Sequence, residues 1–435
     1  MARMTGLVSL VNAALLILPQ VAAQYCQTIN PAFPPVMADG YESRVVMNGL
    51  KAPRHLVFDP LGNLLIAEQD EVGIRYAKLT DNGGLDVCVE SSKVLIPDIT
   101  LNHGIDISHD GTILYVSSKT DVYAYPYDAA EGTVGIPKRL ITIPDQTDHV
   151  TRTLRLSRKI PELLLVSVGS NANIDPGTVD IASGRSQIRI FNLTTIGDEP
   201  VNYTSGEVLG WGLRNSVGVD EDPVTGDIWS VENSSDNLNR TEVDVHNTNP
   251  AEELNYHGNL TFIGPERGAN YGYPLCVTAW DTSVLSMIPN ITVGTQFVVG
   301  TPSDNITDEM CQNERIAPRI SFPSHTAPLD IKIHPNGSSA YISFHGSWNR
   351  QPGDGYRLSL VNFTDGEPTH LSNSSSAEIR IMTNSNNTAC PDSCFRPVGL
   401  AWDAQGRLFV TSDNTGELFR DHWRLKTPSS MGLVR

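Results

Sequence analysis

Apolar and polar residues alternate with a period of two in six stretches of the chain, and each stretch passes through a turn into a nearly unbroken apolar run. Alternation predicts a strand with one buried face, and the apolar run predicts a strand buried on both faces. Each stretch therefore predicts a β-hairpin. The six are "APRHLVFDPLGNLLIAEQD" from Ala52, "NHGIDISHDGTILYVSSKT" from Asn102, "TRTLRLSRKIPELLLVSVGS" from Thr151, "LRNSVGVDEDPVTGDIWSVENSSD" from Leu213, "APLDIKIHPNGSSAYISFHGSW" from Ala327 and "FRPVGLAWDAQGRLFVTSDN" from Phe395.

The turns and the spacing of these hairpins indicate a repeated unit. The third turn lacks glycine, whereas the other five contain one that can supply a positive φ. The hairpins recur every ~45–70 residues, except for one gap of about 114 residues before the fifth. We interpret that gap, which holds Cys276 and Cys311, as an inserted loop region. The turn glycines are Gly62, Gly111, Gly226, Gly337 and Gly406.

Repeats of this length with two clear strands are typical of β-propeller blades, which surround a central channel. Six copies predict an all-β, six-bladed β-propeller that forms a single domain over residues 24–435. A pair of β-sandwiches or a parallel β-helix is the alternative, although their strands usually recur at shorter spacing. A sustained amphipathic helical pattern is missing from the sequence.

The first 23 residues have the pattern of a signal peptide. Arg3 precedes the apolar run "LVSLVNAALLILPQVAA", which ends in two alanines at a plausible cleavage point. A membrane anchor is the alternative, but the run is short and contains Asn12 and Pro19. Since no later stretch is long and apolar enough to span a bilayer, we expect a secreted chain with no membrane partner.

Six cysteines fit an oxidising compartment, and they allow 15 pairings. We interpret them as Cys26–Cys88, Cys276–Cys311 and Cys390–Cys394; one or two buried free thiols are the alternative. Zinc-type CxxC spacing is absent. Eleven Asn-x-Ser/Thr sequons support glycosylated secretion: Asn192, Asn202, Asn233, Asn239, Asn259, Asn290, Asn305, Asn336, Asn362, Asn373 and Asn386.

The formal charge of −18 argues against a nucleic-acid partner, which would need a basic face. The places where hairpins begin and end are different, because arginine, histidine and asparagine gather there. In a propeller, the innermost strands begin at one rim of the channel, so these residues are expected to meet. They are Arg54 and His55, Asn102 and His103, His149 and Arg152, Arg214 and Asn215, His325, and Arg396 at hairpin starts, with Glu68, Glu232, Asn233, His345, Asn349 and Arg350 at the ends of second strands.

Several arginines around one axis repel one another unless an anion lies among them. We therefore interpret the rim as the binding site of a polyanionic ligand, with a histidine as a base near neutral pH. Acidic groups and carbonyls of "SVENSSD" are suited to hold a hard cation beside it. The alternative is that these polar groups cap strands and bind water in the channel.

Five motifs carry a family resemblance. They are "DHVTRTL" at 148–154, "GLRNSVGV" at 212–219, "NYGYP" at 270–274, "FHGSWNR" at 344–350 and "FRPVGLAWD" at 395–403. With them the chain resembles the soluble pyrroloquinoline quinone (PQQ) sugar dehydrogenases, and within these the fungal PQQ-dependent pyranose dehydrogenases and sorbosone dehydrogenase-like proteins. The resemblance covers roughly residues 40–425. It implies a six-bladed propeller with PQQ and Ca²⁺ in its channel.

The resemblance also implies roles for individual residues. His149 matches the catalytic base, with Asp148 beside it in sequence, and Arg214 matches the group that stabilises a developing oxyanion. Ser234 and Ser235 would bind Ca²⁺ through main-chain oxygens, where the bacterial enzymes have Gly-Pro. A glycan on the neighbouring Asn233 would collide with the channel, so that sequon is predicted to be unmodified. The cofactor-binding residues are Asn102, Arg214, Asn215 and Arg396, with Arg54, His103, His345 (lysine in the bacterial enzymes) and Arg350 as further channel residues.

The implied reaction is oxidation of a sugar at its anomeric carbon, with a pyranose or 2-keto-aldose as the substrate. The chain has no CxxCH haem motif, and we expect neither a cytochrome domain nor a cellulose-binding module. We therefore expect electrons to leave to a separate extracellular haem or copper protein. Two alternatives stay open: a calcium-dependent propeller lactonase or other hydrolase, and a non-catalytic carbohydrate- or protein-binding propeller.

Overall fold

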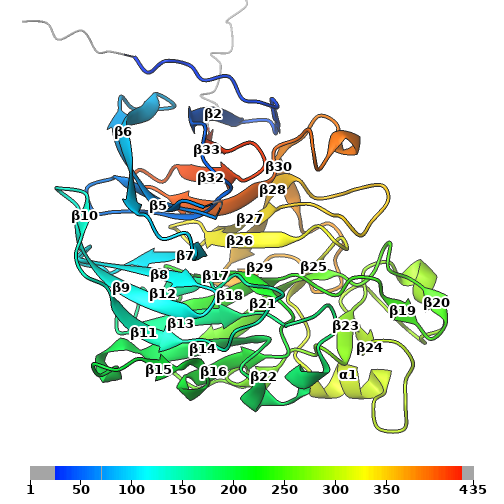
Figure 1. The fold of residues 1–435 in the computed structure, drawn as a ribbon. Helices are drawn as coiled ribbons and strands as arrows, with labels where there is room; N and C mark the ends of the chain where they lie inside the picture. Colours follow the sequence, from blue (N-terminus) through cyan, green and yellow to red (C-terminus); the bar gives the residue numbers. More distant parts are fainter. Residues whose placement is uncertain (1–24, 70, 424–435) are drawn as a thin grey trace, which may run out of the picture.

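The six innermost strands of the molecule form a closed ring. The structure, a computed structural model, describes residues 25–69 and 71–423, so the predicted signal peptide at 1–23 lies outside the described residues. Each innermost strand contacts the innermost strands of both neighbouring sheets, and the last contacts the first. The described chain is therefore a six-bladed β-propeller, as predicted, with the blades following one another in chain order (Figure 1).

All six predicted hairpins are present as antiparallel pairs, and each supplies the two inner strands of one blade. The innermost strands, from the first blade to the sixth, are β3 (Pro53–Phe58), β7 (Leu101–Ile107), β12 (Leu154–Leu156), β17 (Ser216–Glu221), β26 (Pro328–Ile333) and β31 (Pro397–Trp402). The second strands, in the same order, are β4 (Leu64–Glu68), β8 (Ile113–Ser118), β13 (Leu163–Val168), β18 (Asp227–Glu232), β27 (Ser339–Phe344) and β32 (Leu408–Ser412).

The outer strands complete the blades. The first has β5 (Gly73–Asp81) and β6 (Val87–Ile96); the second has β9 (Asp121–Asp128), β10 (Thr133–Val134), β11 (Lys138–Thr142) and β15 (Val201–Asn202); the third has β14 (Gln187–Asn192), β16 (Glu207–Trp211) and β22 (Ala269–Asn270). The fourth has β21 (Glu252–Asn259) and β25 (Ile320–Phe322); the fifth has β28 (Arg357–Thr364), β29 (Glu367–Pro368), β30 (Ile379–Thr383) and β1 (Val36–Met37); the sixth has β33 (Glu417–Trp423) and β2 (Tyr41–Met47).

Two N-terminal strands close the ring. β1 pairs with β30 in the fifth blade, and β2 pairs with β33 in the sixth, so the sixth blade combines strands from both ends of the described chain. The Cys26–Cys88 disulfide then ties the segment before these strands to β6 of the first blade. Ring closure therefore depends on main-chain pairing between residues more than 370 positions apart in sequence, such as Ser43 and Asp421.

Apolar residues of the second strands are buried, as their uninterrupted runs predict. The innermost strands contain glycines at positions where a neighbouring blade lies very close. A Cβ atom built on Gly104, Gly218 or Gly399 would lie 2.1 Å from Arg152 O, 2.8 Å from the Asp330 backbone or 2.3 Å from Arg54 O. Glycine at these positions lets adjacent innermost strands approach closely around the channel.

The gap before the fifth hairpin is only partly an insertion, because β21 and β25 from this gap belong to the fourth blade. β22, also from this gap, belongs to the third blade. The rest includes two small ribbons, β19 (Asn239–Arg240) with β20 (Val243–Asp244) and β23 (Cys276–Thr278) with β24 (Gln296–Val298), and the helix α1 (Asp308–Glu314), which the Cys276–Cys311 disulfide ties to β23. A short 3₁₀ turn, η5 (Thr282–Leu285), lies between β23 and β24. Those outside the gap are η1 (Pro176–Val179), η2 (Ile181–Ser183), η3 (Leu193–Thr195), η4 (Tyr203–Ser205) and η6 (Asn387–Ala389).

The predicted cysteine pairing is confirmed, since all six cysteines are described and form Cys26–Cys88, Cys276–Cys311 and Cys390–Cys394. The five turn glycines all have positive φ, from 71° at Gly111 to 82° at Gly226. Among the helices of the described residues, none has both the length and the apolarity needed to cross a bilayer.

The interface that closes the ring generates a stability prediction. Phe409 is fully buried between the sixth and first blades, with its ring edge-on to Phe58 at 4.9 Å. We expect Phe409→Ala to lower the free energy of unfolding by about 3–5 kcal/mol, because it leaves a cavity between two blades. Leu61→Ala, at a side chain that is 64% exposed, is the control and should change it by less than about 0.5 kcal/mol. Denaturant unfolding measures both; equal midpoints would contradict the assigned interface.

Candidate active site in the channel

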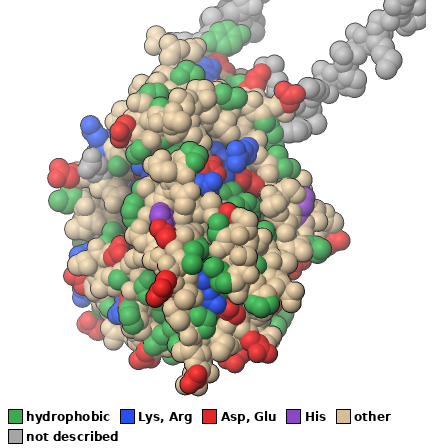
Figure 2. Space-filling view, turned by 90° about the vertical axis from the view of Figure 1, so that its right-hand side faces the viewer, with side chains coloured by type: hydrophobic (Ala, Val, Ile, Leu, Met, Phe, Trp, Pro, Cys, Tyr) green, Lys and Arg blue, Asp and Glu red, His purple; other side chains and the backbone are tan. Residues whose placement is uncertain are grey.

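A polar cavity of about 280 Å³ lies where hairpins from several blades begin and end. These ends meet because each hairpin is antiparallel, so the start of the innermost strand pairs with the end of the second strand. Pro397 pairs with Ser412 in this way, and Pro53 pairs with Glu68. In Figure 2, basic and acidic side chains lie together around a hollow on the side of the molecule that carries the insertion. The cavity is lined by Arg54, His149, Arg214, Asn215, Asn233, Ser234, Asp236, Glu252, His325, Ala327, Leu329, His345, Gly346, Trp348 and Arg396.

His149 is held as a neutral base. Its Nδ1 lies 3.0 Å from Ser170 O and 2.9 Å from Ser170 Oγ. A carbonyl oxygen can only accept, so Nδ1 carries the proton and Nε2 keeps its lone pair. Burial, followed by the nearby charge of Arg214, lowers the pKa of His149 to about 4, against the opposing charge of Asp148. Its backbone has φ of 38°, a costly conformation for a non-glycine residue and one typical of functional sites.

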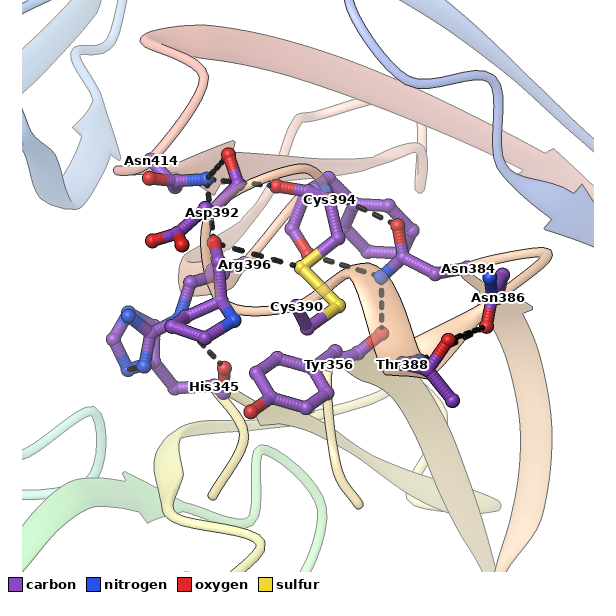
Figure 3. The surroundings of a disulfide bond; sticks show 12 residues. His345, Tyr356, Asn384, Asn386, Thr388, Cys390, Asp392, Cys394, Arg396 and Asn414 are labelled. Atoms are coloured by element: carbon purple, nitrogen blue, oxygen red, sulfur yellow. Dashed lines mark hydrogen bonds between the residues drawn. A yellow bond between two sulfur atoms is a disulfide. The ribbon is translucent and has the colours of Figure 1, made fainter. Parts of the chain in front are cut away.

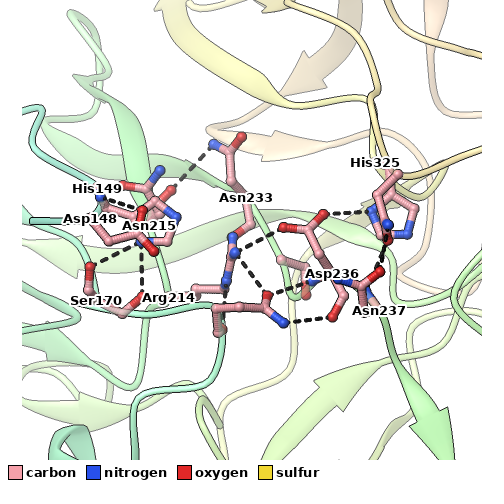
Figure 4. A network of polar contacts seen from close by, with 12 residues as sticks. Asp148, His149, Ser170, Arg214, Asn215, Asn233, Asp236, Asn237 and His325 are labelled. Atoms are coloured by element: carbon pink, nitrogen blue, oxygen red, sulfur yellow. Dashed lines mark hydrogen bonds and ion pairs between the residues drawn. The ribbon is translucent and has the colours of Figure 1, made fainter.

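Asp148 contacts His149 through the backbone: its carboxylate accepts a hydrogen bond of 2.9 Å from the His149 N–H. Arg214 is positioned from three sides (Figure 4). It donates to Asn173 O and Oδ1, both at 3.0 Å, to Asn233 O at 3.2 Å and to Asp236 Oδ2 at 3.0 Å. Only 5% of Arg214 is exposed, so its guanidinium is fixed beside the base before any ligand binds.

His325 is a second cation of this wall. Its Nδ1 lies 3.3 Å from Asp236 Oδ1, and its Nε2 lies 2.5 Å from His246 O. Both neighbours are acceptors, so both ring nitrogens carry protons. Burial lowers the pKa of His325, but the hydrogen bond to Asp236 and the charge of Glu252 outweigh it and leave the pKa raised. Asp236 thereby joins Arg214 and His325.

Arg54, His345 and Arg396 form the opposite wall, and Asp413 joins them. Its carboxylate lies 3.1 Å from Arg54 Nη1 and 2.9 Å from His345 Nε2. Burial opposes ionisation of Asp413, but the hydrogen bond from His345 and the charges of Arg54 and Arg396 lower its pKa to about 2. Sequence reasoning missed Asp413. It directly follows β32, the position in the repeat that supplied His345 after β27, so the repeat contained the signal.

Four of the predicted site residues do not line this cavity. Asn102 donates to Val150 O at 3.2 Å, and Arg350 donates to Ser324 O at 3.2 Å and Pro352 O at 3.3 Å. His103 is fully buried and outside the cavity lining; its Nδ1 lies 3.3 Å from Arg54 Nε, and its ring is 4.0 Å from that of His55. The fourth, Ser235, is also fully buried.

Main-chain oxygens beside the cavity suit a hard cation. Within the described residues, no hydrogen bond is directed to the carbonyl oxygens of Ser234 or Ser235, and the buried Ser235 Oγ has no partner either. Glu252, 3% exposed, accepts a hydrogen bond of 2.7 Å from the Ser234 N–H. No group of three or more His, Cys, Asp or Glu side chains in the described part of the chain could hold a metal. A Ca²⁺ ion would therefore rely on carbonyl oxygens and on a ligand.

Residues 35–420 match the TrAA12-like family. The chain is 46% identical over 406 residues to a pyrroloquinoline quinone-dependent sugar dehydrogenase of Hypocrea jecorina (strain QM6a), a match that covers 91% of this chain and 92% of that protein. It is 39% identical over 407 residues to a pyrroloquinoline quinone-dependent pyranose dehydrogenase of Coprinopsis cinerea, covering 89% of this chain but 54% of that protein. It thus spans about half the length of the Coprinopsis relative.

Solved structures give the same relationship. The calcium structure of the Trichoderma reesei family AA12 enzyme superposes with a TM-score of 0.88 at 45% identity, over 91% of this chain and 99% of that one. The holo form of the pyranose dehydrogenase PQQ domain from Coprinopsis cinerea superposes with a TM-score of 0.85 at 38% identity, over 90% and 98%. The chain therefore belongs to the TrAA12-like family and shares its six-bladed β-propeller fold.

Proposed function

We propose that the protein is a secreted, PQQ- and calcium-dependent sugar dehydrogenase that oxidises the anomeric carbon of pyranoses or 2-keto-aldoses and passes the electrons to an external acceptor. The observation that carries this proposal is the neutral base His149 beside fixed guanidinium groups in one cavity. The activities named for the Hypocrea and Coprinopsis relatives support it.

The donors around the cavity fit a planar polyanion. Arg54, Arg214 and Arg396 line it from three blades, and guanidinium groups pair well with carboxylates. We assign these arginines, with Asn215 and His345, to hold PQQ, and the carbonyls of Ser234 and Ser235 to hold Ca²⁺. When bound, PQQ supplies the quinone that accepts a hydride from the sugar, and Ca²⁺ acts on it as a Lewis acid.

The residues of the chain then supply base catalysis and charge stabilisation. His149 Nε2 removes the proton of the anomeric hydroxyl, while Ser170 holds the ring through Nδ1. Arg214 stabilises the negative charge that develops on oxygen, because Asn173 and Asp236 fix its guanidinium before the reaction. The carboxylate of Asp148 lies next to His149 and partly offsets the cations that lower its pKa.

The N-terminal segment and the disulfides bear on secretion and domain organisation. We propose that residues 1–23 are a signal peptide and that 24–435 form one catalytic domain. Three disulfides support an oxidising compartment. Electrons would leave to a separate haem or copper protein.

Loss of the base should stop sugar oxidation without stopping cofactor binding. We expect the deglycosylated protein to bind PQQ only with Ca²⁺, and an aldose or 2-keto-aldose to reduce the bound quinone. His149→Ala should slow this reduction by about 10²- to 10⁴-fold, because one general base is removed. His370→Ala, outside the cavity, is the matched control. Quinone absorbance follows binding and reduction; failure of the wild type to bind PQQ overturns the proposal, and lactone hydrolysis without PQQ favours a hydrolase.

The depressed pKa of His149 predicts the acidic limb of the pH profile. The base form is present above a pKa of about 4 and is lost as pH falls through that value. Quinone reduction under single-turnover conditions should therefore stay constant from pH 6 to about pH 5 and fall tenfold per pH unit below about pH 4. Arg214→Gln should move the limb to higher pH, because the second cause of the shift is gone. A wild-type midpoint near 6.5 would contradict the neutral, buried base.

Two sequons are predicted to carry no glycan. Asn233 Nδ2 donates to Pro328 O at 2.7 Å and Asn215 O at 3.3 Å, and Asn259 Nδ2 donates to Thr225 O at 2.9 Å and Asp227 Oδ1 at 3.3 Å. A glycan bonded to either nitrogen would displace these contacts. Peptide mapping after enzymatic deglycosylation in ¹⁸O water should show no conversion at either site, with the exposed Asn386 as comparison. Conversion at Asn233 would contradict the assigned cavity wall.

A further inference from the structure

We propose that Asp413 is the positioning residue of the cofactor site: its carboxylate fixes the tautomer of His345 and, through it, the orientation of Arg396, while also holding Arg54. The inference rests on the proposed function for the identity of the ligand. The hydrogen bonds that support it join side chains of the protein and do not involve the ligand. Figure 3 shows His345 and Arg396 turned toward each other beside the loop of the Cys390–Cys394 disulfide.

Three blades meet at this carboxylate. Arg396 precedes β31 and Asp413 follows β32, so both stand at the same end of the sixth hairpin, where Asp413 N–H donates to Arg396 O at 3.3 Å. His345 follows β27 of the fifth blade, and Arg54 lies on β3 of the first. A single side chain at this position therefore contacts Arg54 of one neighbouring blade and His345 of the other.

The tautomer follows from the donors on either side of the His345 ring. Arg396 Nη2 lies 3.0 Å from His345 Nδ1, and a guanidinium has no lone pair to accept with, so Nδ1 is the acceptor. Nε2 then carries the proton and donates to Asp413, whose two oxygens both lie 2.9 Å away. Arg396 Nε also donates to His345 O at 3.2 Å. The hydrogen bonds therefore run in one direction only: Arg396 donates to His345, and His345 donates to Asp413.

The backbone on both sides of Asp413 is fixed as well. Asn414 Nδ2 donates to Pro391 O at 2.9 Å and to Cys394 O at 3.0 Å, which ties the end of β32 to the disulfide loop. Arg396 N–H donates to Ser412 Oγ at 3.0 Å, and its guanidinium lies 5.8 Å from the Tyr356 ring centre. The carboxylate is therefore presented from a rigid support, as a group that orients others must be.

Removal of the Asp413 charge distinguishes a positioning role from a purely electrostatic one, because the two roles predict opposite changes in affinity for the anion. A carboxylate beside an anion site repels the anion, so by Coulomb's law its removal should strengthen binding. Positioning predicts the opposite. In Asp413→Asn, an amide has one oxygen and one NH₂ group, whereas Arg54 and His345 both need an acceptor. One donor would then face another donor, and Arg54 and His345 would lose their arrangement.

PQQ titration of the Ca²⁺-loaded protein, followed by quenching of tryptophan fluorescence, tests the sign. We expect Asp413→Asn to raise the Kd for PQQ by about tenfold or more, as for loss of a charged hydrogen bond. Asp392→Asn is the matched control: it removes the same charge from an exposed side chain nearby, whose backbone carbonyl rather than carboxylate accepts from Asn414. It should leave the Kd unchanged or slightly lower. Equal or tighter binding by Asp413→Asn overturns the proposal.

A second readout needs neither PQQ nor activity. In apo-protein with ¹⁵N-labelled histidine, the His345 signal, assigned by its loss in His345→Gln, should show protonated Nε2 and bare Nδ1 in two-bond ¹H–¹⁵N spectra. In Asp413→Asn this single tautomer should be lost. A wild-type His345 with protonated Nδ1 overturns the proposal even if every Asp413 variant misfolds. If PQQ fails to bind the wild type while this tautomer is present, the proposed function fails and the positioning role survives.

Discussion

Pairing of β2 with β33 is the constraint on which the rest of the structure depends. Every blade contributes its innermost strand to one ring, and each of these strands contacts two neighbours. The sixth blade takes its outermost strand, β2, from the N-terminal part of the chain, which holds the first and last blades together. Arg54 of the first blade then comes within 3.1 Å of Asp413 of the sixth. Without that pairing, the two walls of the cavity would have no fixed separation.

Two carboxylates organise the basic side chains once the ring is closed. Asp236 joins Arg214 to His325, and Asp413 joins Arg54 to His345. The two histidines nevertheless differ in charge, because His325 faces acceptors at both nitrogens whereas the Nδ1 of His345 faces the donor Arg396. Burial favours such paired arrangements, since an unpaired charge in this cavity would lose its hydration without compensation. The protein is acidic overall, yet its cavity is cationic because of which residues stand at the hairpin ends.

Local pattern was sufficient for much of the fold. Alternation, apolar runs and turn glycines predicted the six hairpins, because these signals act between neighbouring residues. The rim position of Arg54, Arg214 and Arg396 followed from the repeat, since equivalent positions of equivalent blades face one axis. The strands β21 and β25 were hidden in a long gap, because an insertion between them interrupted the spacing that made the other blades recognisable.

The sequence by itself determined the blade number and which residues stand at the hairpin ends that face the channel, because hydrophobic period and turn chemistry are encoded within each repeat. It allowed 15 cysteine pairings, and the structure settled which of them is formed. Only the tertiary structure decided which rim residues share the cavity and in which state. It buried His103 outside the cavity lining, directed Arg350 to backbone carbonyls and brought Asp413 against His345. It also gave His149 its neutral form, since burial and the charge of Arg214 act through space between residues 65 positions apart. Such distances, and the desolvation that accompanies them, exist only after the ring has closed.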